Sequence, residues 1–262
     1  MPDISSFRRY EYKYLMDEEK YALVRELTKD RLTLDNYGLT TICNIYYDTD
    51  DFRLVRNSIE SPLYKEKLRL RSYGIPGDDS KCFIEIKKKF DGVVYKRRIS
   101  VKYRSALDYL RYGVRPVLCE KNTQILHEID YFREHYKPVP KVYIAYEREA
   151  FYGNEDNAFR VTFDTDIRSR TDMLDLSAGS SGKCIFPEKM YLMEAKAAGA
   201  MPLWFVKILN EAQLRKTTFS KYGTVYRNGL WRSAPIFEKM TADDPEQGSA
   251  GRYIIMNNAL KG

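Results

Sequence analysis

The sequence has few of the residues that metal centres and redox sites usually require. It contains four cysteines, none of them in a C-x-x-C pair, and two histidines, His127 and His135, which lie in one helical stretch. This scarcity argues against a cysteine–histidine zinc site. Scattered thiols are typical of reduced cysteines in the cytoplasm. The four cysteines are Cys43, Cys82, Cys119 and Cys184.

Long apolar runs are also missing. No stretch approaches the roughly 18 apolar residues that a membrane-spanning helix needs, and the opening segment MPDISSFRRYEYKY lacks the apolar core of a signal peptide. We therefore expect a cytoplasmic protein, which could reach the inner face of a membrane through a partner.

A phosphate-binding P-loop is absent as well. The segment 180–184, SSGKC, resembles one, but Ser177 replaces the first glycine of that motif and Cys184 replaces its Ser/Thr. Nucleotide binding of the P-loop type is therefore not expected.

What the sequence does have is charge. It has 262 residues, of which 44% are hydrophobic and 31% charged, and its net charge is +7. This composition predicts a globular protein. The positive charge favours a polyanionic partner without choosing between nucleic acid, an anionic membrane and free phosphates. We expect one domain over residues 1–233 and a loosely attached polar tail over 234–262.

The most informative stretch is Tyr64–Gly74, YKEKLRLRSYG. Side chains alternate between the two faces of a strand, so a strand here would place Leu68 and Leu70 on one face and four cations on the other. Neighbouring cations about 7 Å apart repel each other by about 2 kcal/mol at an effective dielectric constant of about 20. A solvated strand tolerates this repulsion, so the stretch alone does not establish an anion site. The four cations are Lys65, Lys67, Arg69 and Arg71.

Similar alternation recurs along the chain. Eight strands are expected, over residues 7–15, 40–48, 64–73, 81–89, 93–103, 141–150, 159–168 and 190–197. Amphipathic helices are expected over about 17–29, 105–113, 120–136 and 202–214, with Asp17 and Ser105 as N-terminal caps and Gly113 as a stop. Helices would cover the apolar face of the sheet. The charged face then either faces water in an open sheet or lines a closed barrel without exposed edges.

Seven segments carry a more specific signal. They are KYL at Lys13–Leu15, KLRLRSY at Lys67–Tyr73, FIEIKKK at Phe83–Lys89, AYER at Ala145–Arg148, FRVTFD at Phe159–Asp164, MEAK at Met193–Lys196 and FSKY at Phe219–Tyr222. In this order they resemble the VTC (vacuolar transporter chaperone) polyphosphate polymerase domain, a member of the CYTH-like triphosphate tunnel metalloenzymes. The resemblance implies an α+β fold, a closed eight-stranded antiparallel β-barrel with helices packed outside. It also implies transfer of the γ-phosphate of ATP, or of another nucleoside triphosphate, to a growing inorganic polyphosphate chain, with Mn²⁺ or Mg²⁺.

The resemblance further implies roles for individual residues. Arginine suits bidentate contacts to phosphate oxygens, whereas lysine acts as a mobile point charge. Phosphoryl transfer mainly requires positioning and charge neutralisation. The implied catalytic cations are Lys13, Arg69, Arg71, Lys87, Arg148, Arg160 and Lys221; Tyr146, Lys196 and Ser220 would bind substrate, and Glu194 would hold the metal.

One departure from the superfamily pattern lies in the first strand. Relatives that hydrolyse triphosphates carry E-x-E-x-K there, whereas this chain has Arg9 in place of the first glutamate and keeps Glu11 and Lys13. Loss of a carboxylate weakens the case for metal-dependent hydrolysis and suits transfer to a phosphate chain end.

Three functions therefore stay open. The first is a nucleotide-dependent polyphosphate polymerase acting on ATP and on polyphosphate or pyrophosphate, and a membrane-protein partner could receive its product. The second is a tunnel-type triphosphatase. The third is a non-catalytic binder of polyphosphate or nucleic acid. Glu194 argues against the third, because a pure anion binder gains nothing from a carboxylate among its cations. Nucleic acid is not expected, because most of the 22 tyrosines fall at strand positions where aromatic residues pack.

Overall fold

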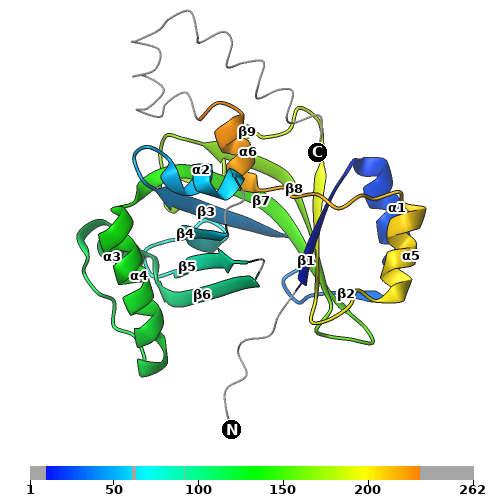
Figure 1. Cartoon of the computed structure of the whole chain (residues 1–262), viewed down its shortest axis with the longest axis horizontal. Helices are drawn as coiled ribbons and strands as arrows, with labels where there is room; N and C mark the ends of the chain where they lie inside the picture. Colours follow the sequence, from blue (N-terminus) through cyan, green and yellow to red (C-terminus); the bar gives the residue numbers. More distant parts are fainter. Residues whose placement is uncertain (1–9, 61–62, 92, 231–262) are drawn as a thin grey trace, which may run out of the picture.

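The computed structural model describes residues 10–60, 63–91 and 93–230 (Figure 1). Arg9 and the tail predicted over 234–262 lie outside these residues. The described chain forms one antiparallel sheet whose long strands run in the order β1-β10-β8-β7-β3-β4-β5-β6, with β2 added beside β7 and β9 beside β8. The strands are β1 (Tyr10–Met16), β2 (Leu32–Leu34), β3 (Thr40–Asp48), β4 (Tyr64–Tyr73), β5 (Lys81–Phe90), β6 (Val93–Lys102), β7 (Val139–Gly153), β8 (Arg160–Arg170), β9 (Lys183–Cys184) and β10 (Tyr191–Ala197).

Helices lie around the sheet in three pairs (Figure 1). Helices α1 and α5 cover one end of the sheet, α3 and α4 cover the opposite end, and α2 and α6 lie side by side above its middle. The helices are α1 (Glu18–Thr28), α2 (Arg53–Ile59), α3 (Tyr103–Tyr112), α4 (Thr123–Tyr136), α5 (Leu203–Glu211) and α6 (Lys221–Arg227), with short 3₁₀ turns at Glu120–Asn122 and Leu176–Ala178.

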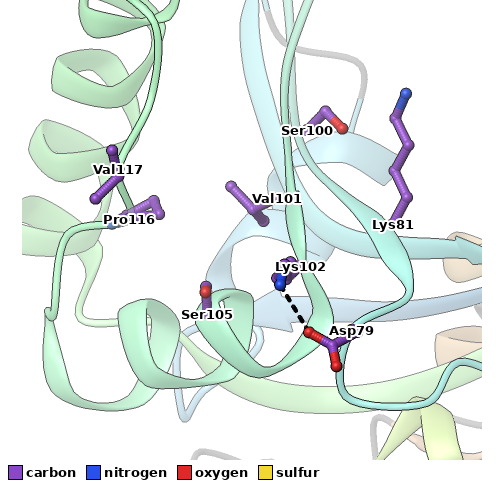
Figure 2. Close-up of a pocket in the computed structure, with 8 residues that line it drawn as sticks. All are labelled: Asp79, Lys81, Ser100, Val101, Lys102, Ser105, Pro116 and Val117. Atoms are coloured by element: carbon purple, nitrogen blue, oxygen red, sulfur yellow. Dashed lines mark hydrogen bonds and ion pairs between the residues drawn. The ribbon is translucent and has the colours of Figure 1, made fainter.

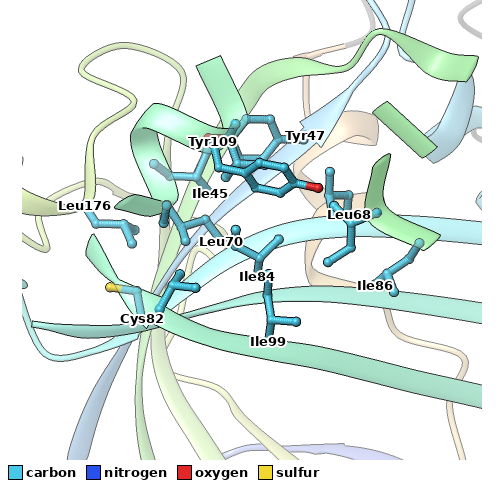
Figure 3. Packing of buried hydrophobic residues seen from close by; sticks show 14 of the residues in the cluster. Ile45, Tyr47, Leu68, Leu70, Cys82, Ile84, Ile86, Ile99, Tyr109 and Leu176 are labelled. Carbon is cyan, nitrogen blue, oxygen red and sulfur yellow. The ribbon is translucent and has the colours of Figure 1, made fainter. Parts of the chain in front are cut away.

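The apolar residues of alternating strands meet these helices. On β4 and β5, Leu68, Leu70, Ile84 and Ile86 are buried in one cluster with Tyr109 of α3 (Figure 3). Burial of one such aliphatic side chain contributes about 1.5–3 kcal/mol. A second cluster lies where β1, β8 and β10 pack against α1 and α5, and includes Met16, Phe163, Met193 and Phe205. We call the face that bears these two clusters the outer face.

The opposite face, called the inner face below, has two different parts. Near α2 and α6 it is apolar: Tyr46 and Ile144 share a buried cluster with Val55 and Tyr222. The Tyr222 hydroxyl donates to buried Asp48 at 2.9 Å, which ties α6 to β3. Elsewhere the inner face carries the charged residues predicted for the site. Helices α2 and α6 therefore fill one part of the inner face and leave the charged part beside it.

The predicted barrel is not closed. Within the described strands the sheet ends at β1 and β6, and no ladder of hydrogen bonds joins these two edges. The sheet nevertheless curls, and this brings strands from its two ends close together. The Glu11 carboxylate of β1 lies 3.7 Å from the Lys87 ammonium of β5, near the other end of the strand order. Backbone pairing of Lys13 with Thr217 also covers part of the β1 edge. The structure thus corrects the closed barrel to an open, curled sheet.

Local predictions had mixed outcomes. Asp17 caps α1 through its side chain, as predicted, and Gly113 ends α3 with a positive φ of 77°. The predicted cap at Ser105 is wrong, because α3 begins at Tyr103 and Ser105 lies inside it. Strand β6 runs directly into this helix, so no separate cap residue is used. The hairpin between β5 and β6 is confirmed by the pairing of Phe90 with Val93.

Candidate functional site

Strand register brings most of the predicted site residues together on the inner face. Arg69 and Arg71 lie two residues apart on β4. Lys13 of β1 pairs with Glu194 of β10, and Arg148 of β7 pairs with Asp164 of β8. Because strand side chains alternate, these pairings place the cations of separate strands on one face.

Tyr146 lies at the centre of this group and is 1% exposed. The Arg71 guanidinium donates to its hydroxyl at 3.1 Å. The Arg148 guanidinium carbon lies 5.1 Å from the centroid of the Tyr146 ring, and the Lys221 ammonium lies 4.4 Å from it. Burial raises the pKa of Tyr146, but these three cations outweigh it and the pKa is lowered overall. Three predicted cations therefore surround one predicted substrate-binding hydroxyl.

Asp164 anchors two of these cations and was not among the predicted site residues. It is fully buried, accepts from the Arg148 Nη2 at 2.7 Å, and also accepts from the Lys221 ammonium. Burial raises the pKa of Asp164, but Arg148 and Lys221 more than offset this and lower it. An ionised carboxylate thus holds two predicted phosphate ligands in fixed positions. The sequence did offer one signal for Asp164: it lies two residues from Thr162 and four from Arg160, so all three were expected on the same face of the strand.

Glu194 and Glu11 form a carboxylate pair around Lys13. The Oε1 atom of each carboxylate lies 3.4 Å from the Lys13 ammonium. Lys196 also donates to Glu194 at 2.9 Å. Burial raises the pKa of Glu194, but Lys196, Lys13 and other cations hold it well below its ordinary value. Both carboxylates therefore offer anionic oxygens close together on adjacent strands.

These oxygens fit a divalent metal of the Mg²⁺ or Mn²⁺ kind. In the described part of the chain, no three His, Cys, Asp or Glu residues are grouped to hold an ion by themselves. Mg²⁺ is usually held by one or two carboxylates together with substrate phosphates. Glu194 and Glu11 match that limited ligand set, so a metal would fit here in company with a triphosphate.

Lys67, Lys87 and Ser220 lie where the curled sheet meets the start of α6. The Lys67 ammonium donates to the Ser220 hydroxyl at 3.0 Å, and that hydroxyl also caps α6 by accepting from the backbone of Gly223. Burial, together with Lys87 and Lys13, lowers the pKa of Lys67 to about 7. Burial also lowers the pKa of Lys87. Cations are thus crowded beyond what the nearby carboxylates neutralise, which favours a polyanion.

Arg160 is the predicted cation that stands apart. It pairs in register with Lys196, so it shares the inner face, but its side chain is 44% exposed. Its guanidinium lies 3.7 Å from the Asp35 carboxylate rather than among the residues around Tyr146. Arg160 therefore lies at the rim of the group.

Glu85 is a further residue absent from the predicted set. It is 1% exposed and lies on β5 between Arg69 and Arg98 of the neighbouring strands. Its sequence signal was the strand parity that it shares with Lys87. Lys96 of β6, which contacts it at 2.8 Å, was missed as well.

One cavity lies away from this group. It has a volume of about 470 Å³ and opens beside β6 and the start of α3 (Figure 2). An ion pair between Lys102 and Asp79, at 2.8 Å, crosses its rim. None of its lining residues belongs to the group around Tyr146, so this cavity is not the candidate site. The residues that line it are Asp79, Lys81, Ser100, Val101, Lys102, Ser105, Pro116 and Val117.

No helix among the described residues is both long and apolar enough to cross a membrane.

Comparisons with known proteins agree with this geometry. The family model of the VTC domain matches residues 8–228. A search of curated proteins gave no match. Among solved structures, a Bacillus halodurans protein provisionally assigned as an adenylate cyclase is 13% identical, with a TM-score of 0.51 over 81% of this chain and 95% of that one. A Hippeastrum protein, provisionally assigned as an adenylyl cyclase and described as having a dominant triphosphatase activity, is 15% identical, with a TM-score of 0.49 over 84% of this chain and 95% of that one.

The match to the Bacillus halodurans structure indicates a shared fold. The family match extends from β1 through α6 and includes every residue of the inner-face group. The chain belongs to the VTC domain family.

Proposed function

We propose that the chain is a polyphosphate polymerase, a metal-dependent phosphotransferase that moves the γ-phosphoryl group of ATP onto a growing polyphosphate chain. One observation carries the proposal: in a VTC-domain chain, Arg71, Arg148 and Lys221 converge on buried Tyr146 beside the Lys13–Glu194 pair. This arrangement provides cations for several phosphates and carboxylates for a metal on one face of the curled sheet.

The reaction itself requires little covalent chemistry from the protein. A terminal oxygen of the polyphosphate chain attacks the γ-phosphorus and forms the new P–O bond. The bond from that phosphorus to the β,γ-bridging oxygen breaks, and the nucleoside diphosphate leaves with the electron pair. Catalysis then depends on holding attacking and leaving oxygens in line and on neutralising their charge.

The inner-face cations would position the phosphate groups and neutralise their charge. Arg69, Arg71 and Arg148 are suited to bidentate contact with phosphate oxygens. Lys13, Lys87 and Lys221 would act as point charges, with Arg160 receiving a phosphate at the rim. Tyr146, Ser220 and Lys196 would complete substrate binding. Asp164 would keep Arg148 and Lys221 in place through its ion pairs with both.

Glu194, assisted by Glu11, would hold the divalent metal. When bound, Mn²⁺ or Mg²⁺ would neutralise negative charge on the triphosphate oxygens. Lys13 lies within 3.4 Å of both carboxylates and is the cation that would yield these oxygens to the metal. Burial lowers the pKa of Lys13, but Glu194 and Glu11 outweigh it and raise the pKa, so the lysine remains charged.

Hydrolysis of tripolyphosphate or nucleotide is the second candidate. It is favoured by one observation, that Glu11 of the first-strand motif is retained and points to Lys13 beside Glu194. It is disfavoured by Arg9, which replaces the other glutamate of that motif. The substrates proposed here are a nucleoside triphosphate and polyphosphate or pyrophosphate, in the cytoplasm; the described residues give no support to a membrane-protein partner, and none is proposed.

The decisive test is incubation of the full chain with ATP and Mn²⁺, followed by gel analysis of polyphosphate and assay of free orthophosphate. A polyphosphate ladder with release of ADP supports the polymerase. Orthophosphate without a ladder identifies a triphosphatase. Retention of intact ATP, with tripolyphosphate still bound, identifies a non-catalytic binder.

A further inference from the structure

Glu85 has an unusual position for a carboxylate. It lies in the middle of β5 on the inner face and is 1% exposed, with Arg69 of β4 and Arg98 of β6 as its cross-strand partners. Its neighbours along the strand, Ile84 and Ile86, point to the opposite face and are fully buried there. A carboxylate this deeply buried is strongly destabilising unless cations and hydrogen bonds compensate it.

The compensation comes from four cations on two strands. The Arg69 Nε and Nη2 atoms lie 2.7 and 2.6 Å from the same oxygen, Oε2 of Glu85. The Lys96 ammonium lies 2.8 Å from the Oε1. Arg71 and Arg98 lie farther away, at 3.8 and 3.9 Å. One carboxylate thus links the inner-face cations of β4 to those of β6.

The geometry of Arg69 shows what this link does. Its third nitrogen, Nη1, donates to the Tyr46 hydroxyl at 3.1 Å. Every nitrogen of the guanidinium is therefore held by a partner on a neighbouring strand. Since the guanidinium is planar with five N–H donors, these contacts determine the plane in which the other donors point. Loss of Glu85 would leave Arg69 held by Tyr46 alone and repelled by Lys96 and Arg71.

We propose that Glu85 is a positioning residue that orients Arg69 and Lys96 toward one bound phosphate chain, an inference that rests on the proposed phosphate site. Glu85 does not contact the phosphate, because it is anionic and covered by its cations. Its contribution is that Arg69 and Lys96 need not reorganise when the polyanion arrives, which lowers the cost of binding.

The charge state of Lys96 supports the same role. Burial lowers the pKa of Lys96 to about 7, Glu85 acts in the opposite direction, and Arg69 and Arg71 lower it further. These groups, Arg98 and Lys87, which is the cross-strand partner of Lys96, are the charges that face Lys96 and Glu85 from β4, β5 and β6. Without the carboxylate, Lys96 would lose its proton at a lower pH and contribute less to phosphate binding near neutrality.

The test compares Glu85→Gln with Glu66→Gln in the full chain. Glu66 is a matched control: it is a buried carboxylate of β4 on the outer face, 3.7 Å from Lys88. The measured quantity is the Kd of tripolyphosphate, without nucleotide or metal, by titration calorimetry at pH 6 to 9. This assay does not require turnover, so failure to synthesise polyphosphate would refute the proposed function without deciding the role of Glu85.

The sign of the effect separates the alternatives. Glu85→Gln adds one positive charge to the site, so a purely electrostatic role predicts tighter binding. Positioning predicts weaker binding, by roughly 10-fold or more, as expected when hydrogen bonds to a charged group are lost. The decline of affinity with pH should also begin at a lower pH than in the wild type. Glu66→Gln should leave both the Kd and its pH profile unchanged.

A more conservative variant, Glu85→Asp, keeps the test valid if Glu85→Gln does not fold. Glu85→Asp keeps the charge but shortens the side chain by one methylene, so it should weaken binding in the same direction and by less. If Glu85→Gln does not fold, Glu85→Asp carries the comparison. Unchanged or tighter binding in the folded Glu85 variants would overturn the proposal, and so would an equal loss in Glu66→Gln.

Discussion

The inner and outer faces of strand β4 use adjacent residues for opposite purposes. On the outer face, Leu68 and Leu70 are fully buried against the helices of the first apolar cluster. On the inner face, Arg69 and Arg71 are surrounded by Glu85, Tyr46 and Tyr146, with hydrogen bonds to each guanidinium. The same strand therefore supports the fold with one face and concentrates charge with the other.

The energetics of the two faces differ accordingly. Apolar burial on the outer face stabilises the fold directly. Buried ion pairs on the inner face contribute little net stability, because desolvation of the charges offsets most of their attraction. Stability and phosphate binding should therefore be separable by substitutions only one residue apart, and the following predictions test that separation.

The largest expected change is on the outer face. Leu70→Ala should lower the free energy of unfolding by about 2–5 kcal/mol, because it leaves a cavity in a close-packed core. Urea denaturation measures this loss. The folded fraction should bind tripolyphosphate with wild-type affinity, since the Leu70 side chain lies in the outer-face cluster. Weaker binding in proportion to the lost stability would contradict the separation of the two faces.

The next effect concerns the metal ligand on the inner face. Glu194→Gln should reduce polyphosphate synthesis by roughly 10² or more, about 3 kcal/mol in barrier terms, because the amide holds a divalent metal poorly. Metal-free tripolyphosphate should bind as well as before or slightly more tightly, since a negative charge has been removed. Wild-type synthesis by this variant at limiting Mn²⁺ would show that Glu194 does not hold the metal.

Arg69→Ala provides the contrasting signature. It removes a cation that binds phosphate in both the ground state and the transition state, so synthesis and tripolyphosphate affinity should fall together. Calorimetry and the gel assay on one preparation measure both quantities. An Arg69 variant that loses synthesis and keeps its affinity would assign this arginine to the transition state alone.

A smaller effect should appear with pH. Lys67 has a pKa of about 7 in the folded protein, because burial, Lys87 and Lys13 disfavour its charged form. In the unfolded chain its pKa is about 10.5, so between these values the unfolded state binds more protons. The contribution of Lys67 to the free energy of unfolding therefore rises with pH from about 7 to 10.5, and it is lost as pH falls through 7.

Phosphate binding should show the opposite trend. A polyanion favours charged Lys67, so tripolyphosphate affinity should weaken as pH rises through about 7. Lys67→Met should reduce this dependence, and should not abolish it, because the pKa of Lys87 is lowered as well. Thermal unfolding with and without tripolyphosphate at several pH values gives both trends. Parallel slopes in the wild type and in Lys67→Met would exclude Lys67 as their source.

Strand parity explains why so much of the site was predictable. The alternation that places Arg69 and Arg71 opposite Leu68 and Leu70 is visible in the sequence, and the structure confirms it. Glu85 and Asp164 obey the same parity, yet they were missed, because the sequence does not show which cations a carboxylate will contact. Their roles depend on cross-strand register, with Arg69 opposite Glu85 and Arg148 opposite Asp164.

Closure and local caps were less predictable, each for a physical reason. Whether β1 reaches β6 depends on the accumulated curl of eight strands, and no short motif determines it. Helix α2 begins after Phe52, which has a positive φ of 59° and no side-chain cap, so it lacked the usual start signal. The backbone amides of Leu54 and Val55, in its first turn, instead donate to the carboxylate of Asp48, which lies at the end of β3.

The most direct test of the central claim is whether the inner face binds inorganic polyanions by itself. Tripolyphosphate should be titrated into the full wild-type chain at low salt, without nucleotide or metal, and followed by thermal unfolding. Binding only to the native state should stabilise it by about 2.7 kcal/mol at one hundred times Kd, and added salt should weaken the effect by screening. Arg69→Ala should show a smaller shift. No change in melting temperature at millimolar tripolyphosphate would contradict a phosphate-binding inner face.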